Sequence, residues 1–262
     1  MTGPNASPVT LQRVQGHVAV VTLDRPEARN AVNAALAAAL ESAVAETERD
    51  SDIRGVVLTG AGNGVFCAGA DLKEVAAGGA AALFRANGGF AGFVEAERSK
   101  PWIAAVNGKA LAGGFEIVLA CDMVVAAESA AFGLPEVTRG LIAAAGGVYR
   151  LPRALPRALA LELITTGDAM SASSAERHGL VNRVVADAQV VDTAVALARR
   201  IARNAPVAVR ESLQLARRAG ELAEADARVL TRAARDRNAQ TEDYKEGPRA
   251  FVEKREPRWL GR

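Results

Sequence analysis

One acidic residue stands in an otherwise small and apolar stretch of the chain. The sequence LAGGFEIVLACDMVV occupies residues 111–125. In it, Glu116 follows Gly-Gly-Phe and precedes Ile-Val-Leu-Ala. This composition indicates a buried element. Burying an ionised carboxylate without partners costs on the order of several kcal/mol, so such groups are usually paired, protonated or functional. Glu116 is therefore the first candidate for chemistry.

Small residues precede two predicted helices. GVFCAGADLKE at 64–74 and VNGKALAGGFEIVLACD at 106–122 each bring alanine and glycine into the expected first helical turn. Backbone N–H groups at a helix start have no intrahelical partner, and the helix dipole is positive there. Two such turns that face one point would form an oxyanion hole for a ligand carbonyl. The same residues also allow close packing, so each stretch alone keeps that second interpretation.

Motifs of other catalytic classes fail on their spacing. TGAGNGVF has Val65 where a dinucleotide-binding fingerprint needs its third glycine, and no serine lies in a nucleophile elbow. Cys67 and Cys121 are far apart, and the only histidines are His17 and His178. We therefore expect no disulfide scaffold, no metal site and no cysteine nucleophile.

Length and charge narrow the class further. The chain has 262 residues, 50% of them hydrophobic, and a net charge of +2, although residues 199–262 hold 16 basic and 10 acidic side chains. We expect one large domain or a domain with a helical extension, and no nucleic-acid partner. The opening MTGPNASPVT is not a secretory signal, and no apolar run reaches membrane-spanning length. These features predict a cytoplasmic protein with no membrane partner.

Short apolar runs alternate with helical patterns through the first part of the chain. Residues 9–24 predict a β-hairpin, and Asn33 begins a helical stretch as a plausible cap. Buried strands are expected at 53–60, 102–108 and 122–128, with a loop and a helix between the last two. This order is typical of an α/β fold with crossover connections.

The pattern changes after residue 171. Successive amphipathic helices follow, so we divide the chain into a core at 1–200 and a helical region at 201–262. The glycine- and alanine-rich segment AAGGAAALFRANGGFAGF at 76–93 leaves two interpretations open, a mobile segment or a helix.

Four motifs in combination resemble those of the crotonase family, also called the enoyl-CoA hydratase/isomerase superfamily. They are FCAGADLKE, NGKALAGGFEIVLACD, FGLPEVTRGLIAAAGG and AERHGLVNRVV, and they occur in the family's order and spacing along nearly the whole chain. The resemblance implies a crotonase-like fold, with β-sheets and crossover helices in spiral ββα repeats, followed by a C-terminal helical trimerisation region. It also implies a homotrimer or a dimer of trimers.

The resemblance assigns roles to particular residues. The backbone N–H groups of Ala70 and Gly113 match the family's oxyanion donors, and Glu116 and Glu136 match its two catalytic glutamates. The positions that match substrate- or CoA-binding residues are Ala28, Arg29, Ala68, Asp71, Leu72, Gly114 and Pro135, with Phe251 and Lys254 supplied by a neighbouring subunit. Ala112 and Ala143 depart from the residues that many members carry, glycine and proline respectively, which leaves the shape of the acyl pocket open.

The two glutamates favour hydration. One carboxylate can take a proton from water while the other helps to deliver a proton to the substrate, which suits working pKa values of roughly 6 to 7. Glu136 follows Pro135, however, and could also be an ordinary acid in a first helical turn. No metal or redox cofactor is expected, because the CoA thioester is itself the substrate.

The expected function is that of an enoyl-CoA hydratase, which adds water syn across the double bond of a 2-enoyl-CoA and gives a 3-hydroxyacyl-CoA. The alternatives are a Δ3-Δ2 enoyl-CoA isomerase, which typically manages with one glutamate at the position of Glu136, or another acyl-CoA reaction of the family. A protein that kept the fold and lost the chemistry, as a binding or nucleic-acid-binding module, is a further alternative from a different class.

Overall fold

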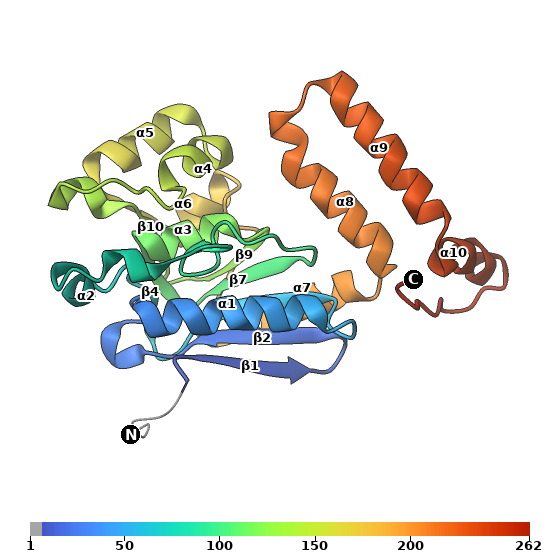
Figure 1. Cartoon of the computed structure of the whole chain (residues 1–262), viewed down its shortest axis with the longest axis horizontal. Helices are drawn as coiled ribbons and strands as arrows, with labels where there is room; N and C mark the ends of the chain where they lie inside the picture. Colours follow the sequence, from blue (N-terminus) through green and yellow to red (C-terminus); the bar gives the residue numbers. More distant parts are fainter. Residues whose placement is uncertain (1–6) are drawn as a thin grey trace.

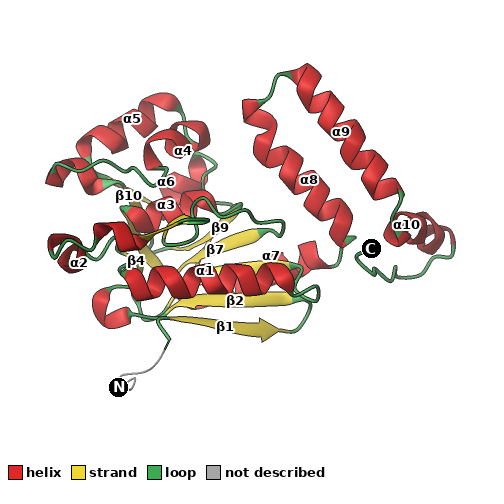
Figure 2. Ribbon diagram, viewed as in Figure 1, coloured by secondary structure: helices red, strands yellow, loops and turns green. Residues whose placement is uncertain are grey.

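The computed structural model describes residues 7–262 and begins with an antiparallel hairpin (Figures 1 and 2). The strands β1 (Val9–Val14) and β2 (Val18–Leu23) pair over their full length, which confirms the predicted hairpin. The first six residues, on which part of the signal-sequence expectation rests, lie outside the described residues.

A six-stranded sheet forms the centre of the core in the order β1-β2-β3-β7-β9-β12. Its inner strands are β3 (Gly55–Gly60), β7 (Trp102–Val106) and β9 (Met123–Ala127), and β12 (Arg183–Val185) closes one edge. All neighbours from β2 onward are parallel. The inner strands read as continuous apolar runs because helices or loops cover both faces of a parallel sheet. The three predicted strands of this sheet are confirmed.

Two long helices pack on this sheet. Helix α1 (Ala34–Arg49) contacts β1 and β2, and α7 (Val190–Ala202) contacts β2, β3, β7 and β9. Figure 2 shows α1 in front of the sheet and α7 behind it. The side chain of Asn33 accepts a hydrogen bond from the Leu36 N–H at 2.9 Å, so the predicted cap is confirmed.

A second sheet has the order β11-β10-β8-β4 and consists of short strands. They are β4 (Gly64–Cys67), β8 (Gly108–Leu111), β10 (Ala131–Gly133) and β11 (Ala169–Ser171). Strands β4 and β8 are parallel neighbours, and the chain runs from them into α2 (Leu72–Ala76) and α3 (Gly113–Ala120). Because the strands are parallel, both helix starts lie at the same edge of this sheet.

The segment at 76–93 forms a turn and a hairpin. After α2 come the 3₁₀ turn η2 (Ala80–Leu83) and the paired strands β5 (Phe84–Arg85) and β6 (Gly89–Phe90). The helix interpretation is therefore wrong. Leu83 and Phe90 are buried, and these apolar side chains anchor the segment despite its glycine content.

Smaller elements complete the core. They are η1 (Pro26–Ala28), η3 (Pro135–Arg139), α4 (Gly147–Ala154), α5 (Arg157–Thr166), α6 (Ala172–Arg177) and η4 (Asp187–Gln189). In the described part of the chain, no helix is both long enough and apolar enough to cross a bilayer.

The C-terminal helices extend away from the layered core (Figure 1). They are α8 (Pro206–Arg218), α9 (Glu224–Ala239) and α10 (Glu242–Val252), with the short turn η5 (Ala219–Glu221) between the first two. The guanidinium of Arg217 pairs with both carboxylate oxygens of Asp122, at 2.7 and 2.8 Å, and ties α8 to the core. The predicted helical region is confirmed, whereas the exact division at residue 200 stays a prediction and falls inside α7.

Candidate active site

The two turns that carry the predicted donors lie against each other. Gly69 has a φ of +89°, and a Cβ placed on it would lie 2.9 Å from the nitrogen of Gly113 and 2.8 Å from the Cβ of Ala112. Only glycine fits this position, because it combines a left-handed backbone with close approach. The sequence stretches at 64–74 and 106–122 therefore meet in space.

The N–H of Ala70 points away from Val32, the residue that pairs with it in an isolated β-bridge. The Val32 N–H donates to the Gly69 oxygen, and the Asp71 N–H donates to the Val32 oxygen, both at 2.8 Å. In a parallel bridge of this kind, the N–H and C=O groups of the middle residue, here Ala70, point away from the partner residue Val32. Within residues 7–262, the Ala70 N–H has no hydrogen-bond acceptor.

The N–H of Gly113 opens helix α3. The Ala112 oxygen accepts from the N–H groups of Phe115 and Glu116, at 2.8 and 3.1 Å, so the helix begins with Gly113 in its first turn. No acceptor for the Gly113 N–H is found among the described residues. Such a group is one of the orphan donors of a helix start.

Glu116 is buried on the same helix, with 3% of its surface exposed. Its Oε1 accepts the N–H of Gly147, at the start of α4, at 2.8 Å. Burial raises the pKa of Glu116 to about 7, the Gly147 hydrogen bond opposes that rise, and the charge of Glu136 adds to it. This carboxyl group is therefore held in place and poised to exchange a proton near neutral pH.

Glu136 lies in the first turn of η3 and is 9% exposed. Its Oε2 is buried and has no hydrogen-bond partner among the described residues. Burial raises the pKa of this carboxyl group as well. A buried acid with a free oxygen and a raised pKa differs from the ordinary first-turn acid of the alternative interpretation, which the helix dipole would stabilise in its charged form.

The remaining predicted positions fall into two groups. Ala68 and Leu72 lie within two residues of Ala70 in the chain, and the Ala68 N–H donates to the Arg29 oxygen at 3.1 Å, which places Arg29 and the preceding Ala28 beside this turn. Gly114 packs on Cys67, and Pro135 directly precedes Glu136. In contrast, Phe251 and Lys254 belong to the C-terminal region, which Figure 1 shows at the opposite end of the molecule from α2. One protomer does not bring these two residues to the site.

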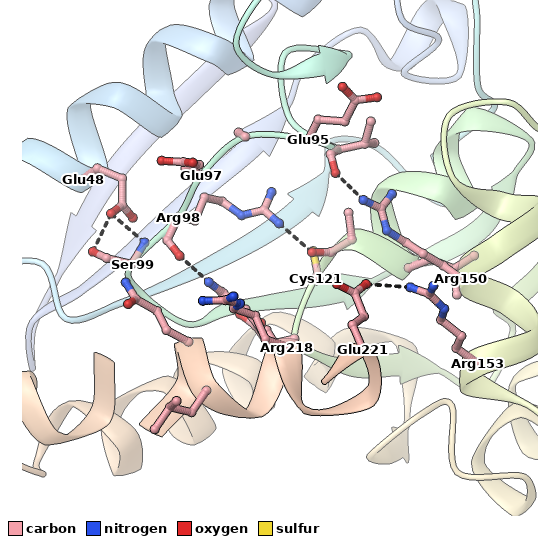
Figure 3. Close-up of a pocket in the computed structure, with 18 of the residues that line it drawn as sticks. Glu48, Glu95, Glu97, Arg98, Ser99, Cys121, Arg150, Arg153, Arg218 and Glu221 are labelled. Carbon is pink, nitrogen blue, oxygen red and sulfur yellow. Dashed lines mark hydrogen bonds and ion pairs between the residues drawn. The ribbon is translucent and has the colours of Figure 1, made fainter. Parts of the chain in front are cut away.

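A large cavity of about 1000 Å³ lies elsewhere, between the core and helices α8 and α9. Figure 3 shows acidic and basic side chains around it, with Arg153 paired to Glu221 and Arg150 directed at a backbone oxygen. Neither Glu116 nor Glu136 lines this cavity. Among residues 7–262, no group of three or more His, Cys, Asp or Glu side chains could hold a metal ion.

Sequence reasoning assigned no role to Gly147, although the motif that contains it was recognised. A Cβ on this residue would lie 2.8 Å from the Cβ of Ala143 and 3.1 Å from Oε1 of Glu116. The glycine pair after an alanine run was the available signal for a tight helix start. The acceptor of its N–H, 31 residues away, could not be inferred from spacing.

The fold and the site together define a class of protein. Adjoining turns with unpaired N–H groups, near two buried carboxyl groups, are typical of enzymes that polarise an acyl carbonyl group. The chain belongs to the enoyl-CoA hydratase/isomerase family, whose model matches residues 13–262.

Named relatives agree with this assignment. Carnitinyl-CoA dehydratase from Salmonella enteritidis is 41% identical over 252 residues, which cover 94% of this chain and 96% of that protein. The structure of an enoyl-CoA hydratase from Mycobacterium tuberculosis has a TM-score of 0.93 at 39% identity, and that of a carnitinyl-CoA hydratase from Mycobacterium avium has 0.77 at 48%. Each covers 98% of this chain and 100% of the solved one. The predicted family, fold and crotonase-type hydratase class are confirmed.

Proposed function

We propose that the protein hydrates a 2-enoyl-CoA to a 3-hydroxyacyl-CoA. Glu116 and Glu136 are the acid–base pair, and the N–H groups of Ala70 and Gly113 bind the thioester oxygen. The observation that carries this proposal is the presence of two buried carboxyl groups, one of which holds a hydrogen bond from Gly147 and the other a free oxygen, beside two unpaired donors on adjoining turns. Hydrogen bonds that become stronger as negative charge develops on the thioester oxygen lower the activation barrier for hydration and not only the KM.

Proton balance favours a pair that holds one proton. The ionised carboxylate takes a proton from water as its oxygen attacks C3, and the protonated carboxyl group gives a proton to C2. The pair again holds one proton at the end, so no other acid is needed. Burial raises the pKa of both carboxyl groups, to about 7 for Glu116, which favours a pair that retains a proton more readily than two exposed carboxyl groups would.

The rest of the site is assigned to the substrate. The turn residues Ala28, Arg29, Ala68 and Leu72, with Gly114 and Pro135, contact the CoA ester, and the reaction uses no metal or redox cofactor. A cytoplasmic location stays a prediction from the sequence.

Two substitutions test the acid–base pair. Glu116→Gln and Glu136→Gln should each lower kcat about a hundredfold or more, the usual scale for a general acid or base, while CoA-ester affinity changes much less. Loss of the conjugated thioester absorbance reports the rate over a series of 2-enoyl-CoAs. If both variants kept the wild-type rate, the acid–base assignment would be wrong.

A second candidate is the dehydration of a carnitinyl-CoA, which is the reverse reaction on a substrate with a quaternary ammonium group. The names of the relatives from Salmonella and Mycobacterium avium favour it. The same series of assays, extended with carnitinyl-CoA and with a 3-enoyl-CoA for the isomerase reaction, ranks the three activities by kcat/KM.

We also propose a homotrimer or a dimer of trimers. Helix α8 has no fully buried residue, and Phe251 is 85% exposed, so the C-terminal helices leave surface free for a second copy. Phe251 and Lys254 of one protomer would then reach the CoA of the next. Light scattering that gave the mass of one 27.2 kDa chain at every concentration would contradict this.

A further inference from the structure

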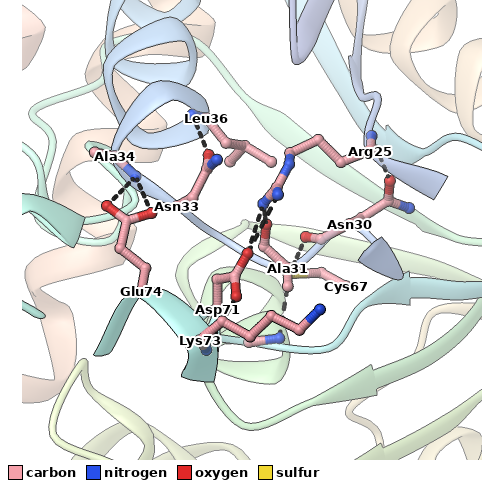
Figure 4. Close-up of polar contacts among 11 residues, drawn as sticks. Arg25, Asn30, Ala31, Asn33, Ala34, Leu36, Cys67, Asp71, Lys73 and Glu74 are labelled. Carbon is pink, nitrogen blue, oxygen red and sulfur yellow. Dashed lines mark hydrogen bonds and ion pairs between the residues drawn. The ribbon is translucent and has the colours of Figure 1, made fainter. Parts of the chain in front are cut away.

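A network of polar contacts connects the loop of Ala70 to the segment at 25–34 (Figure 4). One guanidinium nitrogen of Arg25 donates to the Ala31 oxygen at 2.6 Å, and both terminal nitrogens lie 3.2 Å from Oδ2 of Asp71. The side chains of Arg25 and Asp71 are only 18% and 17% exposed. A guanidinium that is shared between a carbonyl and a carboxylate fixes direction as well as distance.

Asp71 is fully engaged within the protein. Its Oδ1 accepts the Lys73 N–H at 3.2 Å and caps α2, and its own N–H donates to the Val32 oxygen at 2.8 Å. Its Oδ2 is taken by Arg25. The family resemblance predicts that Asp71 contacts CoA, whereas these bonds direct its carboxylate toward the segment at 25–34.

Polar contacts matter here because the helix that follows the turn gives it little buried support, although Gly69 itself packs on Ala112. Helix α2 has five residues and none of them is buried. Its other polar contact with the N-terminal segment is Glu74, whose Oε1 accepts the Ala34 N–H at 3.1 Å. The orientation of the peptide group at Ala70 therefore depends on the residues bonded to its neighbours, Gly69 and Asp71.

We propose that Arg25 is a positioning residue that acts through Asp71 and holds the N–H of Ala70 in line with that of Gly113. The proposal rests on the proposed function, in which Ala70 is an oxyanion donor. Arg25 does not touch the substrate. It fixes the Asp71 carboxylate and the Ala31 carbonyl, which flank the bridge of Val32 with Ala70. The Val32 N–H then holds the oxygen of the planar Gly69–Ala70 peptide, so that its N–H cannot rotate away from the thioester oxygen. Misplacement of a reacting group by about 1 Å can cost a hundredfold in rate.

The test uses two variants. Arg25→Lys keeps the positive charge but loses the planar guanidinium that bonds Ala31 and Asp71 together, and Asp71→Asn keeps a capping side chain but loses the negative charge. The control is Arg217→Lys, at another part-buried guanidinium–carboxylate pair, which joins α8 to the core. Three quantities are measured: kcat for 2-enoyl-CoA hydration, the Kd of butyryl-CoA, and the infrared C=O frequency of bound [1-¹³C]butyryl-CoA. The last reports the strength of the oxyanion hydrogen bonds directly.

We expect Arg25→Lys and Asp71→Asn to lower kcat about tenfold or more, by misplacing a donor, with less than about a threefold change in Kd. The carbonyl frequency of the bound ester should move back toward its value in water in both variants. Arg217→Lys should keep the wild-type frequency and kcat, because a loss of general stability does not change the carbonyl environment of the folded protein.

Two results would overturn the proposal. Either both variants keep the wild-type frequency and kcat, or Asp71→Asn raises the Kd with kcat unchanged, which would make Asp71 a CoA ligand. If Arg25→Lys did not fold, Asp71→Asn alone would decide. Failure of the proposed function is a different result, because wild-type protein would then neither hydrate an enoyl-CoA nor shift the carbonyl frequency.

Discussion

The turns at Ala70 and Gly113 present the same group, a backbone N–H without a partner, but the protein holds them by different means. Helix α3 buries Gly113, Gly114 and Glu116, and added side-chain atoms at either glycine would meet Phe90 or Cys67. Helix α2 buries no residue and depends on Arg25, Val32 and Glu74. Packing alone fixes the Gly113 donor, whereas the Ala70 donor combines the close approach of Gly69 to Ala112 with hydrogen bonds and an ion pair.

This difference explains where small residues and where charges are needed. Glycine is required at 113 and 114 because the Phe90 ring and the Cys67 backbone, from other segments of the same protomer, leave no room for a Cβ. Charged side chains contribute around Ala70 because the five-residue helix that follows has no fully buried residue. Changes at the Gly113 turn should therefore act through steric fit, and changes at the Ala70 turn should act through the direction of its N–H donor.

Ala70→Pro should have the largest effect, because it deletes the donor N–H without breaking an existing hydrogen bond. We expect hydration to fall roughly a hundred- to a thousandfold, the scale for one oxyanion-hole donor. The matched control is Ala70→Ser, which keeps the N–H. Gly113 is a less suitable site, since a Cβ there would lie 2.5 Å from the Phe90 ring. A folded proline variant with the wild-type rate would move the donor role to another residue.

Glu116→Gln should stabilise the protein above neutral pH, even though it removes activity. The pKa of Glu116 is raised to about 7, so the folded state retains a proton that the unfolded state releases between about pH 4.5 and 7. The stability of the wild type should fall through that window by up to about 3 kcal/mol, and the neutral amide should not follow it. Parallel curves of unfolding free energy against pH for the two proteins would contradict the raised pKa.

Gly114→Ala tests the packed turn. A Cβ would lie 2.1 Å from the Cys67 oxygen, so the backbone must move, which should cost about 1–3 kcal/mol of stability. The gain in helix propensity is only about 1 kcal/mol. The control is Gly220→Ala, where a Cβ would meet nothing within 4 Å. Equal denaturant midpoints for both variants would mean that α3 is not held by this contact.

Local sequence signals predicted the elements that form from neighbouring residues. The hairpin at 9–24, the Asn33 cap and the three buried strands follow from short-range patterns and are confirmed. The strands β8 and β10 were missed, because strands of only three or four residues contain too little alternation to detect. The hairpin within 76–93 was missed because the many glycines and alanines interrupt any apolar periodicity that Leu83 and Phe90, its two buried residues, would otherwise produce.

The site was predictable where a motif carries it and unpredictable where contacts join distant residues. A buried Glu116 and two facing helix starts were expected and the structure has them, whereas the burial of Glu136 was not predicted and the catalytic roles stay predictions. The Arg25–Asp71 pair spans 46 positions, and no periodicity or spacing indicates it. Contacts such as the bridge of Val32 with Ala70 and the hydrogen bond from Ala68 to Arg29 bring these two segments together, so the positioning contact depends on the tertiary fold.

Ala112→Gly should have the smallest effect and concerns the backbone of the packed turn. Ala112 has φ 51° and ψ −129°, a conformation that glycine adopts freely and that costs a residue with a side chain about 1–3 kcal/mol. Glycine would release this strain but would lose more conformational entropy on folding, about 0.5–1 kcal/mol, and would give up a methyl contact with Gly69. The net gain should be about 1 kcal/mol, seen as a higher urea midpoint at an unchanged slope, with kcat nearly unchanged because the Gly113 N–H keeps its direction. Ala110→Gly, at a buried strand position of ordinary backbone geometry, is the matched control and should destabilise. If both glycine variants lost stability equally, the methyl contact rather than backbone strain would determine the residue preferred at position 112, and packing would hold this turn even at its least favourable backbone angle.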